Sequence, residues 1–460
     1  MAGGDYEEEE QQTPLLQTSP HELTGNVWTA LAHIITGVIG SGVLSLAWSM
    51  AQLGWIAGPL SLLVFAFFTL VSASFICDVH LYANPNNGTT TMNRSYLQAV
   101  QTILGYKNGL VCGCLVYFSI FKTGVVYTIT SGISMRAIKQ SNCYHKEGHD
   151  AACEYEDTYY MLLFGIVQIV ASQIPNIFHT KWLSIIAATM SFTYSFIGMG
   201  LGLAQVVGQG KIEGSINGIT TTNPTQKVWL IAQALGDIAF SFTFSLILLE
   251  IQSTLKSPPS QKVTMKKAST IAIFTTTFFY LCCGGSGYAA FGDSTPGNLL
   301  TGFGFYEPFW LIDFGNACIV VHLVGGYQIY SQTLFAIVEG WYAEKFPQSV
   351  LTRDVGSLKI LDYVFEVNPL RLCFRSTYVI LTMAVGIIFP YFNQVVAFAG
   401  SVIFWPLTIY FPVEMYFVHN NILPWSTKWI LLRIYTIFCL LVTLYILAGS
   451  IQGLITERFG

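Results

Sequence analysis

Long apolar stretches separated by short polar segments dominate the chain. A helix needs about 20 predominantly apolar residues to cross a bilayer, and the pattern predicts eleven such stretches. They lie at 27–51, 55–80, 109–137, 159–175, 181–208, 228–251, 268–290, 309–338, 374–390, 391–418 and 428–455. We therefore expect an all-α membrane protein with eleven transmembrane helices.

The composition favours a protein embedded in lipid. Of the 460 residues, 53% are hydrophobic and 10% are charged, whereas charged residues make up about 25% of an ordinary soluble domain. The segment 1–26 carries the acidic run DYEEEE and no Lys or Arg. We expect this segment to be a disordered cytosolic tail.

The distribution of Lys and Arg predicts the orientation. With a cytosolic amino terminus, the inner segments hold 14 of these residues, the outer segments hold six, and Lys122 lies at mid-span. Cytosolic loops carry the cationic excess, and an odd number of spans then leaves the carboxyl terminus extracellular. The sequons at Asn87 and Asn93 fall in a loop predicted to be inside, so we expect them to stay unmodified.

Two cysteines stand apart from the others in the chain. Cys143 and Cys153 lie in the predicted outer loop SNCYHKEGHDAACEYED. Because that loop faces an oxidising compartment, we expect a disulfide between them, with two free thiols as the alternative.

The first and sixth predicted spans share a short motif, ALAHI in one and ALGDI in the other. Weak helix formers follow each motif, ITGVIGSG in the first span and AFSFTFS in the sixth. Many transporters consist of inverted repeats, and these two spans open sets of five spans with opposite orientation. We predict one five-helix repeat over 27–208, a second over 228–418 and an additional helix over 428–455.

The weak helix formers predict a break in both opening helices. Irregular backbone at membrane depth is tolerated where it lines a cavity enclosed by protein. Glycines let a ligand approach the backbone, and a helix that restarts near Ser41 would direct free amides at an anion such as an amino-acid carboxylate. Close helix packing is the alternative role of the glycines. The candidate substrate-binding residues here are Gly37, Ile39, Gly40, Ser41 and Gly42.

Three longer blocks resemble a known family. They are GNVWTALAHIITGVIGSGVLSLAWSMAQLGWIAGP at 25–59, FGDSTPGNLLTGFGFYEPFWLIDFGNACIVVHLVGGYQ at 291–328 and VNPLRLCFRSTYV at 367–379. Each resembles plant amino acid permeases of the amino acid/auxin permease family. The resemblance implies a LeuT-type fold whose first and sixth helices unwind around the substrate. It also implies proton-coupled uptake of amino acids across the plasma membrane.

Ionisable residues at mid-span are the next candidates for function, because each costs roughly 2.5–3.5 kcal/mol on insertion scales. His33 precedes Gly37 by one turn, so we expect its imidazole to face the break. His322 lies deep in the eighth span, and either histidine is suited to carry a proton or to form a neutral hydrogen bond. Asp237 matches His33 in the repeat and could accept the proton, pair with a substrate ammonium or cap free amides.

Lys122 is the most unusual of these groups. A lysine at mid-span must find a partner or lose its proton. Its ammonium could replace a bound sodium ion, hold a substrate carboxylate or pair with Asp237, and a purely structural pair is the alternative. Thr123 and Tyr127 follow on the same helix, and their hydroxyls could line the same cavity.

The sixth span alternates aromatic and hydroxyl side chains. Hydroxyls and freed carbonyls could bind a substrate ammonium there, and a Phe could close over the substrate. Simple packing of the aromatics is the alternative. The candidates are Phe240, Ser241, Phe242 and Thr243. Glu250 lies further along, near Lys256, and we expect an inner gate or an ion pair there.

The combined pattern predicts a proton-coupled amino acid symporter of the plasma membrane that works by alternating access. The alternatives are an auxin carrier, a sodium-coupled transporter and a non-transporting amino acid sensor. The chain has no Walker sequence and no Cys/His cluster with zinc spacing, so we expect no cofactor and no metal, and no enzymatic activity. The expected partners are the amino acid, the proton and the lipid bilayer, without nucleic acid, and we expect the monomer to be functional.

Overall fold

The computed structural model describes residues 25–83, 88–148, 150–174, 181–221, 223–302, 308–352, 356–360 and 363–459. Most of the predicted acidic tail and the sequon at Asn87 therefore lie outside the described residues. The side chain of Asn93 is fully buried and donates its amide to the main-chain oxygen of Val79 at 2.8 Å.

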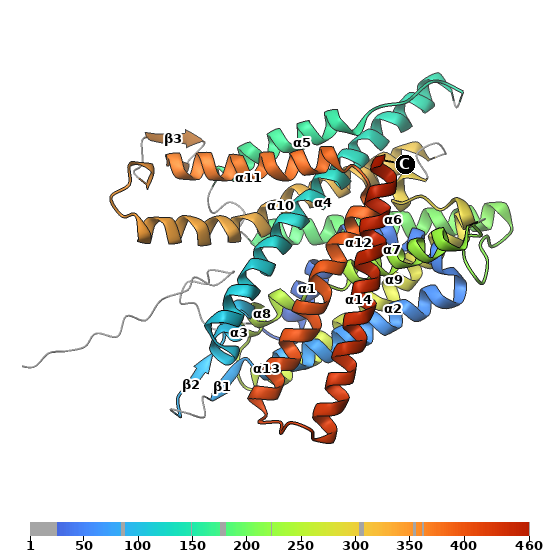
Figure 1. The fold of residues 1–460 in the computed structure, drawn as a ribbon. Helices are drawn as coiled ribbons and strands as arrows, with labels where there is room; N and C mark the ends of the chain where they lie inside the picture. The colour runs from blue at the N-terminus through green and yellow to red at the C-terminus, as the bar shows by residue number, and fades with distance from the viewer. Residues whose placement is uncertain are drawn as a thin grey trace, which may run out of the picture.

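Helices form almost all of the described chain (Figure 1). The first half contains α1 (Val27–Val38), η1 (Ser41–Ser45), α2 (Leu46–Asp78), α3 (Tyr96–Leu104), α4 (Tyr106–Glu147), α5 (Asp157–Ser172) and α6 (Lys181–Gln209). The second half contains α7 (Pro224–Ser241), η3 (Ser245–Ile247), α8 (Leu248–Ser253), α9 (Gln261–Phe291), α10 (Phe309–Lys345), α11 (Pro369–Ile388), α12 (Phe392–Ile403), η7 (Phe404–Tyr410), α13 (Phe411–His419) and α14 (Thr427–Phe459).

The described chain also contains the short helices η4 (Gly292–Ser294), η5 (Leu299–Thr301) and η6 (Val350–Thr352) and two small antiparallel hairpins. Strands β1 (Leu81–Ala83) and β2 (Thr90–Met92) pair beyond α2, and β3 (Gly356–Ile360) pairs with β4 (Tyr363–Val367) before α11. Within the described ranges, nine helical segments are long and apolar enough to cross a membrane. The shorter apolar helices α1 and α5 occupy parts of two further predicted spans.

Gly54 separates the first two predicted spans inside α2. Its dihedrals are φ 83° and ψ 177°, so the two parts of α2 meet at a sharp turn. A Cβ at this position would lie 2.2 Å from the main-chain oxygen of Ile216. Glycine is therefore required both by the positive φ and by the close approach of the loop after α6.

Both predicted helix breaks are present. α1 ends at Val38, and the chain passes through Ile39 and Gly40 before η1 begins. α7 ends at Ser241, and the helix resumes through η3 into α8.

The broken helices lie inside the bundle. α1 packs on α6 and α9, whereas α7 packs on α2, α12 and α14. α10 packs against α4 and α6, and α14, red in Figure 1, covers α7 and α12 from the outside. The two interrupted segments are therefore enclosed by continuous helices, as irregular backbone in a membrane requires.

The tenth predicted span contains an unpredicted π-helix. The π-helical segment η7 connects α12 to α13 and includes Pro406, which lacks an amide hydrogen. The main-chain oxygen of Leu407 in this segment accepts a hydrogen bond from the Tyr96 hydroxyl at 2.6 Å. Such π-helical turns are frequent at functional sites.

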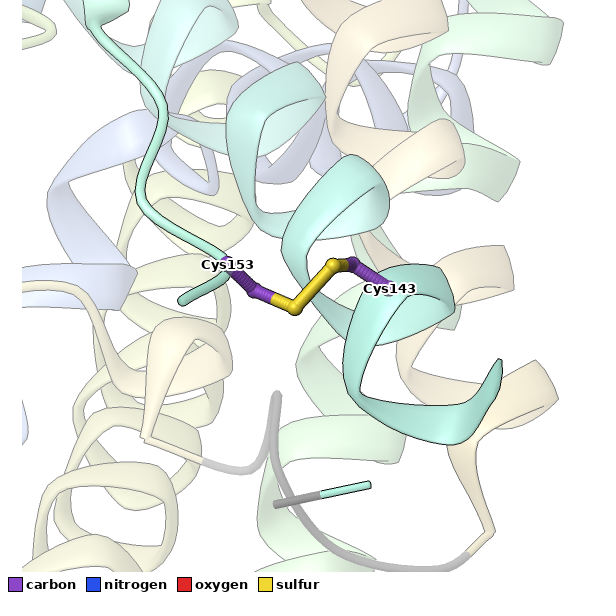
Figure 2. Close-up of a disulfide and its surroundings, with 2 residues drawn as sticks. All are labelled: Cys143 and Cys153. Carbon is purple, nitrogen blue, oxygen red and sulfur yellow. A yellow bond between two sulfur atoms is a disulfide. The ribbon is translucent and has the colours of Figure 1, made fainter. Parts of the chain in front are cut away.

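A disulfide joins Cys143, near the end of α4, to Cys153 in the following loop (Figure 2). The two Cα atoms are 5.9 Å apart. The bond holds the loop that leads into α5 against the end of α4.

We expect the Cys143→Ser, Cys153→Ser double variant to be less stable by about 2–3 kcal/mol, because the short closed loop regains freedom in the unfolded state. Thermal unfolding of the purified protein in detergent measures the change. Replacement of the exposed Cys373 by Ser is the control, and an unchanged melting temperature in the double variant would contradict the expectation.

Candidate functional site

A cavity lies between the two helix breaks, with walls from α1, η1, α4, α7, η3, α10, α12 and η7. Ten of the predicted substrate-binding residues line it: Gly37, Gly40, Ser41, Gly42, Lys122, Thr123, Tyr127, Phe240, Ser241 and Thr243. Segments distant in sequence thus meet at one site.

Two of the predicted substrate-binding residues do not line the cavity. Ile39 and Phe242 are buried elsewhere, with 1% and 0% of their surfaces exposed. The Phe242 ring packs edge-to-face against Tyr280, with ring centroids 5.5 Å apart. Neighbouring side chains in these irregular segments point in different directions. A residue can therefore be adjacent in sequence to cavity-lining residues without facing the cavity itself.

The two broken helices approach each other closely at Gly42. A Cβ at this position would lie 2.6 Å from Ser241 Oγ and 3.1 Å from its Cα. The absence of a side chain at Gly42 therefore lets the two breaks come into contact.

Tyrosine hydroxyls satisfy the carbonyl oxygens that the breaks set free. The Tyr280 hydroxyl on α9 lies 2.8 Å from the Val38 oxygen and 3.1 Å from the Ser241 oxygen. The Tyr194 hydroxyl on α6 donates to the Gly40 oxygen at 3.0 Å. Neither tyrosine was predicted to contact a helix break, although the hydroxyl of a buried Tyr usually has a hydrogen-bond partner.

Ser41 presents polar groups to the cavity at the start of η1. Its Oγ is buried and makes no hydrogen bond with the described residues. The first amides of a helix have no partner inside that helix, so Ser41 combines a free hydroxyl with the positive end of η1. This combination is suited to an anionic group.

Lys122 faces the cavity from α4 without an acidic partner. Only 6% of its surface is exposed, and Nζ lies 4.6 Å from the centroid of the Phe240 ring. Within the described ranges it makes no ion pair, so the hypothesis of a Lys122–Asp237 pair is wrong. Its amino group keeps its hydrogen-bonding capacity available for a ligand in the cavity, and an anion bound there would stabilise the charged form.

Asp237 lies beside the cavity wall and is fully buried. Its Oδ2 accepts from Asn393 Nδ2 at 3.1 Å and from Ser49 Oγ at 3.5 Å. Its Oδ1 has no hydrogen-bond partner in the described part of the chain. The Ser241 hydroxyl donates to the Asp237 main-chain oxygen at 3.0 Å. Because Ser241 is the last residue of α7, Asp237 lies one helical turn before the second break.

The two candidate histidines lie in different environments. His322 is buried directly behind the first break: its Nδ1 is 2.8 Å from the Ala187 oxygen, and a Cβ on Gly40 would lie 3.9 Å from its Nε2. His33 is exposed on α1 and does not line the cavity, so the expectation that its imidazole faces the break was wrong. The buried face of α1 follows Ala30, Ile34 and Val38, and His33 falls outside that stripe.

Several cavity residues were not predicted. They are Val38, Ser119, Leu246, Ile247, Tyr330, Ile403, Leu407 and Thr408, whereas Phe244 and Ser245 belong to the alternating stretch predicted in the sixth span. Pro406 lies in the middle of a predicted span, where a proline commonly marks an irregular helix. It could therefore have indicated that η7 is irregular and contributes to the cavity wall. The others carry no signal of their own, because hydroxyl, aromatic and apolar residues are common throughout the spans.

One group of His, Cys, Asp and Glu side chains in the described ranges has the spacing of a metal site: Cys143, Glu147 and Cys153. Both sulfur atoms of this group are joined in the disulfide between Cys143 and Cys153. This group therefore offers a metal no thiolate ligands.

The fold defines the class of the protein. The structure is similar to the crystal structure of MhsT in complex with L-phenylalanine, with a TM-score of 0.53 and 12% sequence identity. The similarity covers 92% of this chain and 98% of that chain. The LeuT-type fold predicted from the sequence is therefore confirmed.

The chain belongs to the family described as transmembrane amino acid transporter protein, whose model matches residues 23–456. It is 57% identical over 442 residues to probable amino acid permease 7 of Arabidopsis thaliana, which covers 95% of this chain and 94% of that protein. Amino acid permease 3 of the same plant is 49% identical over 437 residues, 94% of this chain and 91% of the relative. The resemblance to plant amino acid permeases is confirmed, and the family is one of multi-pass transporters rather than enzymes.

We expect Gly42→Ala to abolish most transport, because the added methyl group would push the two breaks apart, and overpacking of this kind typically costs about 1–3 kcal/mol. Amino acid uptake normalised to protein in the membrane measures the effect. Gly200→Ala on α6 is the matched control, since a Cβ there meets nothing within 4 Å. Wild-type uptake by Gly42→Ala would show that the close contact between the breaks is not needed.

Proposed function

We propose that the protein carries amino acids together with protons across the plasma membrane into the cell. Amino acid transport is the function of its family. The observation that carries the proposal for this chain is a cavity between two helix breaks that offers separate groups for a carboxylate and an ammonium. Substrate would bind there, and the bundle would then expose the cavity to each side of the membrane in turn.

The carboxylate of the substrate would bind between Lys122 and the start of η1. The Lys122 ammonium has no acidic partner among the described residues, and the Ser41 hydroxyl has no partner at all there. An anionic group would pair with the lysine and accept hydrogen bonds from η1. Charge-assisted hydrogen bonds of this kind are about twice as strong as neutral ones.

The ammonium of the substrate would bind on the side of the second break. The hydroxyl oxygens of Thr243 and Ser245 lie in the cavity wall there and can accept hydrogen bonds. The Phe240 and Tyr330 rings offer aromatic surfaces close by. These groups recognise the part that all amino acids share, so the side chain of the substrate would extend toward Ile403 and Leu407.

The coupling proton would bind at Asp237. Its carboxylate is fully buried, has no cationic partner among the described residues and retains one oxygen without a hydrogen bond. Such a group takes up a proton more readily than it remains ionised. One proton moved across the membrane contributes about 2.3 kcal/mol for each 100 mV. His322 is the second candidate, because it lies directly behind Gly40.

We expect purified protein in liposomes to accumulate amino acids when the outside is made acidic, by about tenfold for each pH unit if one proton accompanies each substrate. Labelled uptake with a panel of amino acids and an auxin as competitors measures this accumulation. A sodium gradient at equal pH is the control. Accumulation that follows sodium would indicate a sodium-coupled transporter, competition by auxin alone would indicate an auxin carrier, and binding without uptake would indicate a sensor.

We expect Lys122→Met to raise KM for amino acids about 10- to 100-fold, because a charge-assisted bond worth about 1.5–3 kcal/mol is lost. Lys107→Met, at an exposed position on the same helix, is the matched control. Wild-type protein should reject amino acid amides, which lack the carboxylate, whereas the variant should discriminate far less. A variant that still rejects the amides as strongly as wild type would assign Lys122 a structural role.

A further inference from the structure

Two carboxylates are fully buried in the described part of the chain, and both lie on the second broken helix. Asp237 is on α7 before the break and is 0% exposed, whereas Glu250 is on α8 after the break and is 3% exposed. The cavity lies between them along the helix, because Ser241 and Ile247 both line its wall. The proposed function uses Asp237 and leaves Glu250 without a role.

Glu250 makes no ion pair in the described structure. Its Oε1 has no hydrogen-bond partner, and Lys256, the expected partner, is exposed and does not contact it. The expected helix-end ion pair is therefore absent.

Other acidic residues near the membrane ends of the bundle do have basic partners. Glu339 contacts both Arg371 and Arg375, with the shortest distance 2.6 Å to Arg375 Nε. Asp78 contacts Lys262 Nζ at 2.8 Å and Lys266 Nζ at 2.6 Å. Glu250, like Asp237, is buried without a basic partner among the described residues, and this requires a physical explanation.

Tyr330 links Glu250 to the cavity. It lines the cavity from α10, and its hydroxyl interacts electrostatically with the Glu250 carboxyl group. α8 also packs against α1, α2, α3 and α9, and no charged or titratable group on these elements interacts with Glu250 in the described ranges. Among the described residues, Tyr330 is therefore the titratable group within electrostatic range of Glu250.

A buried carboxyl group in this position is neutral. Moving an isolated ionised carboxylate into a medium of low dielectric constant is so costly that the group binds a proton instead. Leaving it ionised would require water, and the cytosolic side of α8 is closed in this conformation. Gly25 N donates to the Thr254 oxygen at 3.1 Å, and Lys256 N donates to the Gly25 oxygen at 2.9 Å, which joins the start of α1 to the chain after α8.

We propose that Glu250 is a second proton-binding site, which holds a proton while the inner side of the cavity is closed and releases it to the cytosol when that side opens. Separation of Gly25 from the 254–256 segment would admit water to the carboxyl group. The proton would then pass to water and leave a hydrated carboxylate, with no change in any other bond. The proposal rests on the proposed proton coupling and adds the place where the proton leaves.

Glu250→Gln tests the proposal because it retains the shape of the neutral acid and removes the exchangeable proton. Two assays in liposomes are compared: accumulation driven by a pH gradient, and exchange of labelled for unlabelled amino acid at equal pH. We expect exchange at the wild-type rate and accumulation reduced from about tenfold for each pH unit to about onefold. Glu250→Asp, which retains a titratable group, should restore part of the accumulation.

Glu344→Gln is the matched control, because it makes the same chemical change at an exposed position on α10. Accumulation by Glu250→Gln at the wild-type level would overturn the proposal. Loss of exchange together with accumulation in both Glu250 variants, at normal protein levels, would also overturn it, since it would assign Glu250 a structural role. If wild-type protein itself does not respond to a pH gradient, the proposed function fails first, independently of Glu250.

Discussion

The structure depends on satisfying main-chain carbonyl oxygens at two helix breaks where lipid supplies no water. An unsatisfied carbonyl at that depth costs several kcal/mol, and the protein meets this cost with hydroxyl groups from neighbouring helices. Tyr280 reaches an oxygen in each break, and Tyr194 reaches Gly40. These hydrogen bonds connect the breaks to α6 and α9.

The same principle governs the charges. Where a charged side chain has only a scaffold role, it has a partner, as Arg375 has in Glu339 and in the Ser172 oxygen at 2.7 Å. Lys122 and Glu250 have no such partner among the described residues. An ionisable group that is buried without a partner in a membrane protein tends to mark a functional site. The ligand proposed above is an anion for the lysine and a proton for the glutamate.

Hydrogen bonds from side-chain amides connect α5 and α10, two of the continuous helices that surround the broken ones. Gln328 donates to Gln168 Oε1 at 2.6 Å, and Gln332 donates to the Ser172 oxygen at 3.2 Å, so α10 is tied to α5 over more than one turn. Paired amides inside a membrane protein fix the register of two helices because slippage would leave them unsatisfied. The proposed alternating access would need the broken helices to move as a unit against a frame of helices connected in this way.

The sequence by itself determined the membrane class, the approximate positions of most spans and the two breaks, because apolar length and weak helix formers act locally along the chain. It also determined most of the cavity wall on the broken helices. Only the tertiary structure decided that His33 is exposed, that Lys122 does not pair with Asp237 and that Tyr280 and Tyr194 reach the breaks. Those outcomes depend on helix rotation and on contacts between segments far apart in sequence, and no local pattern encodes either.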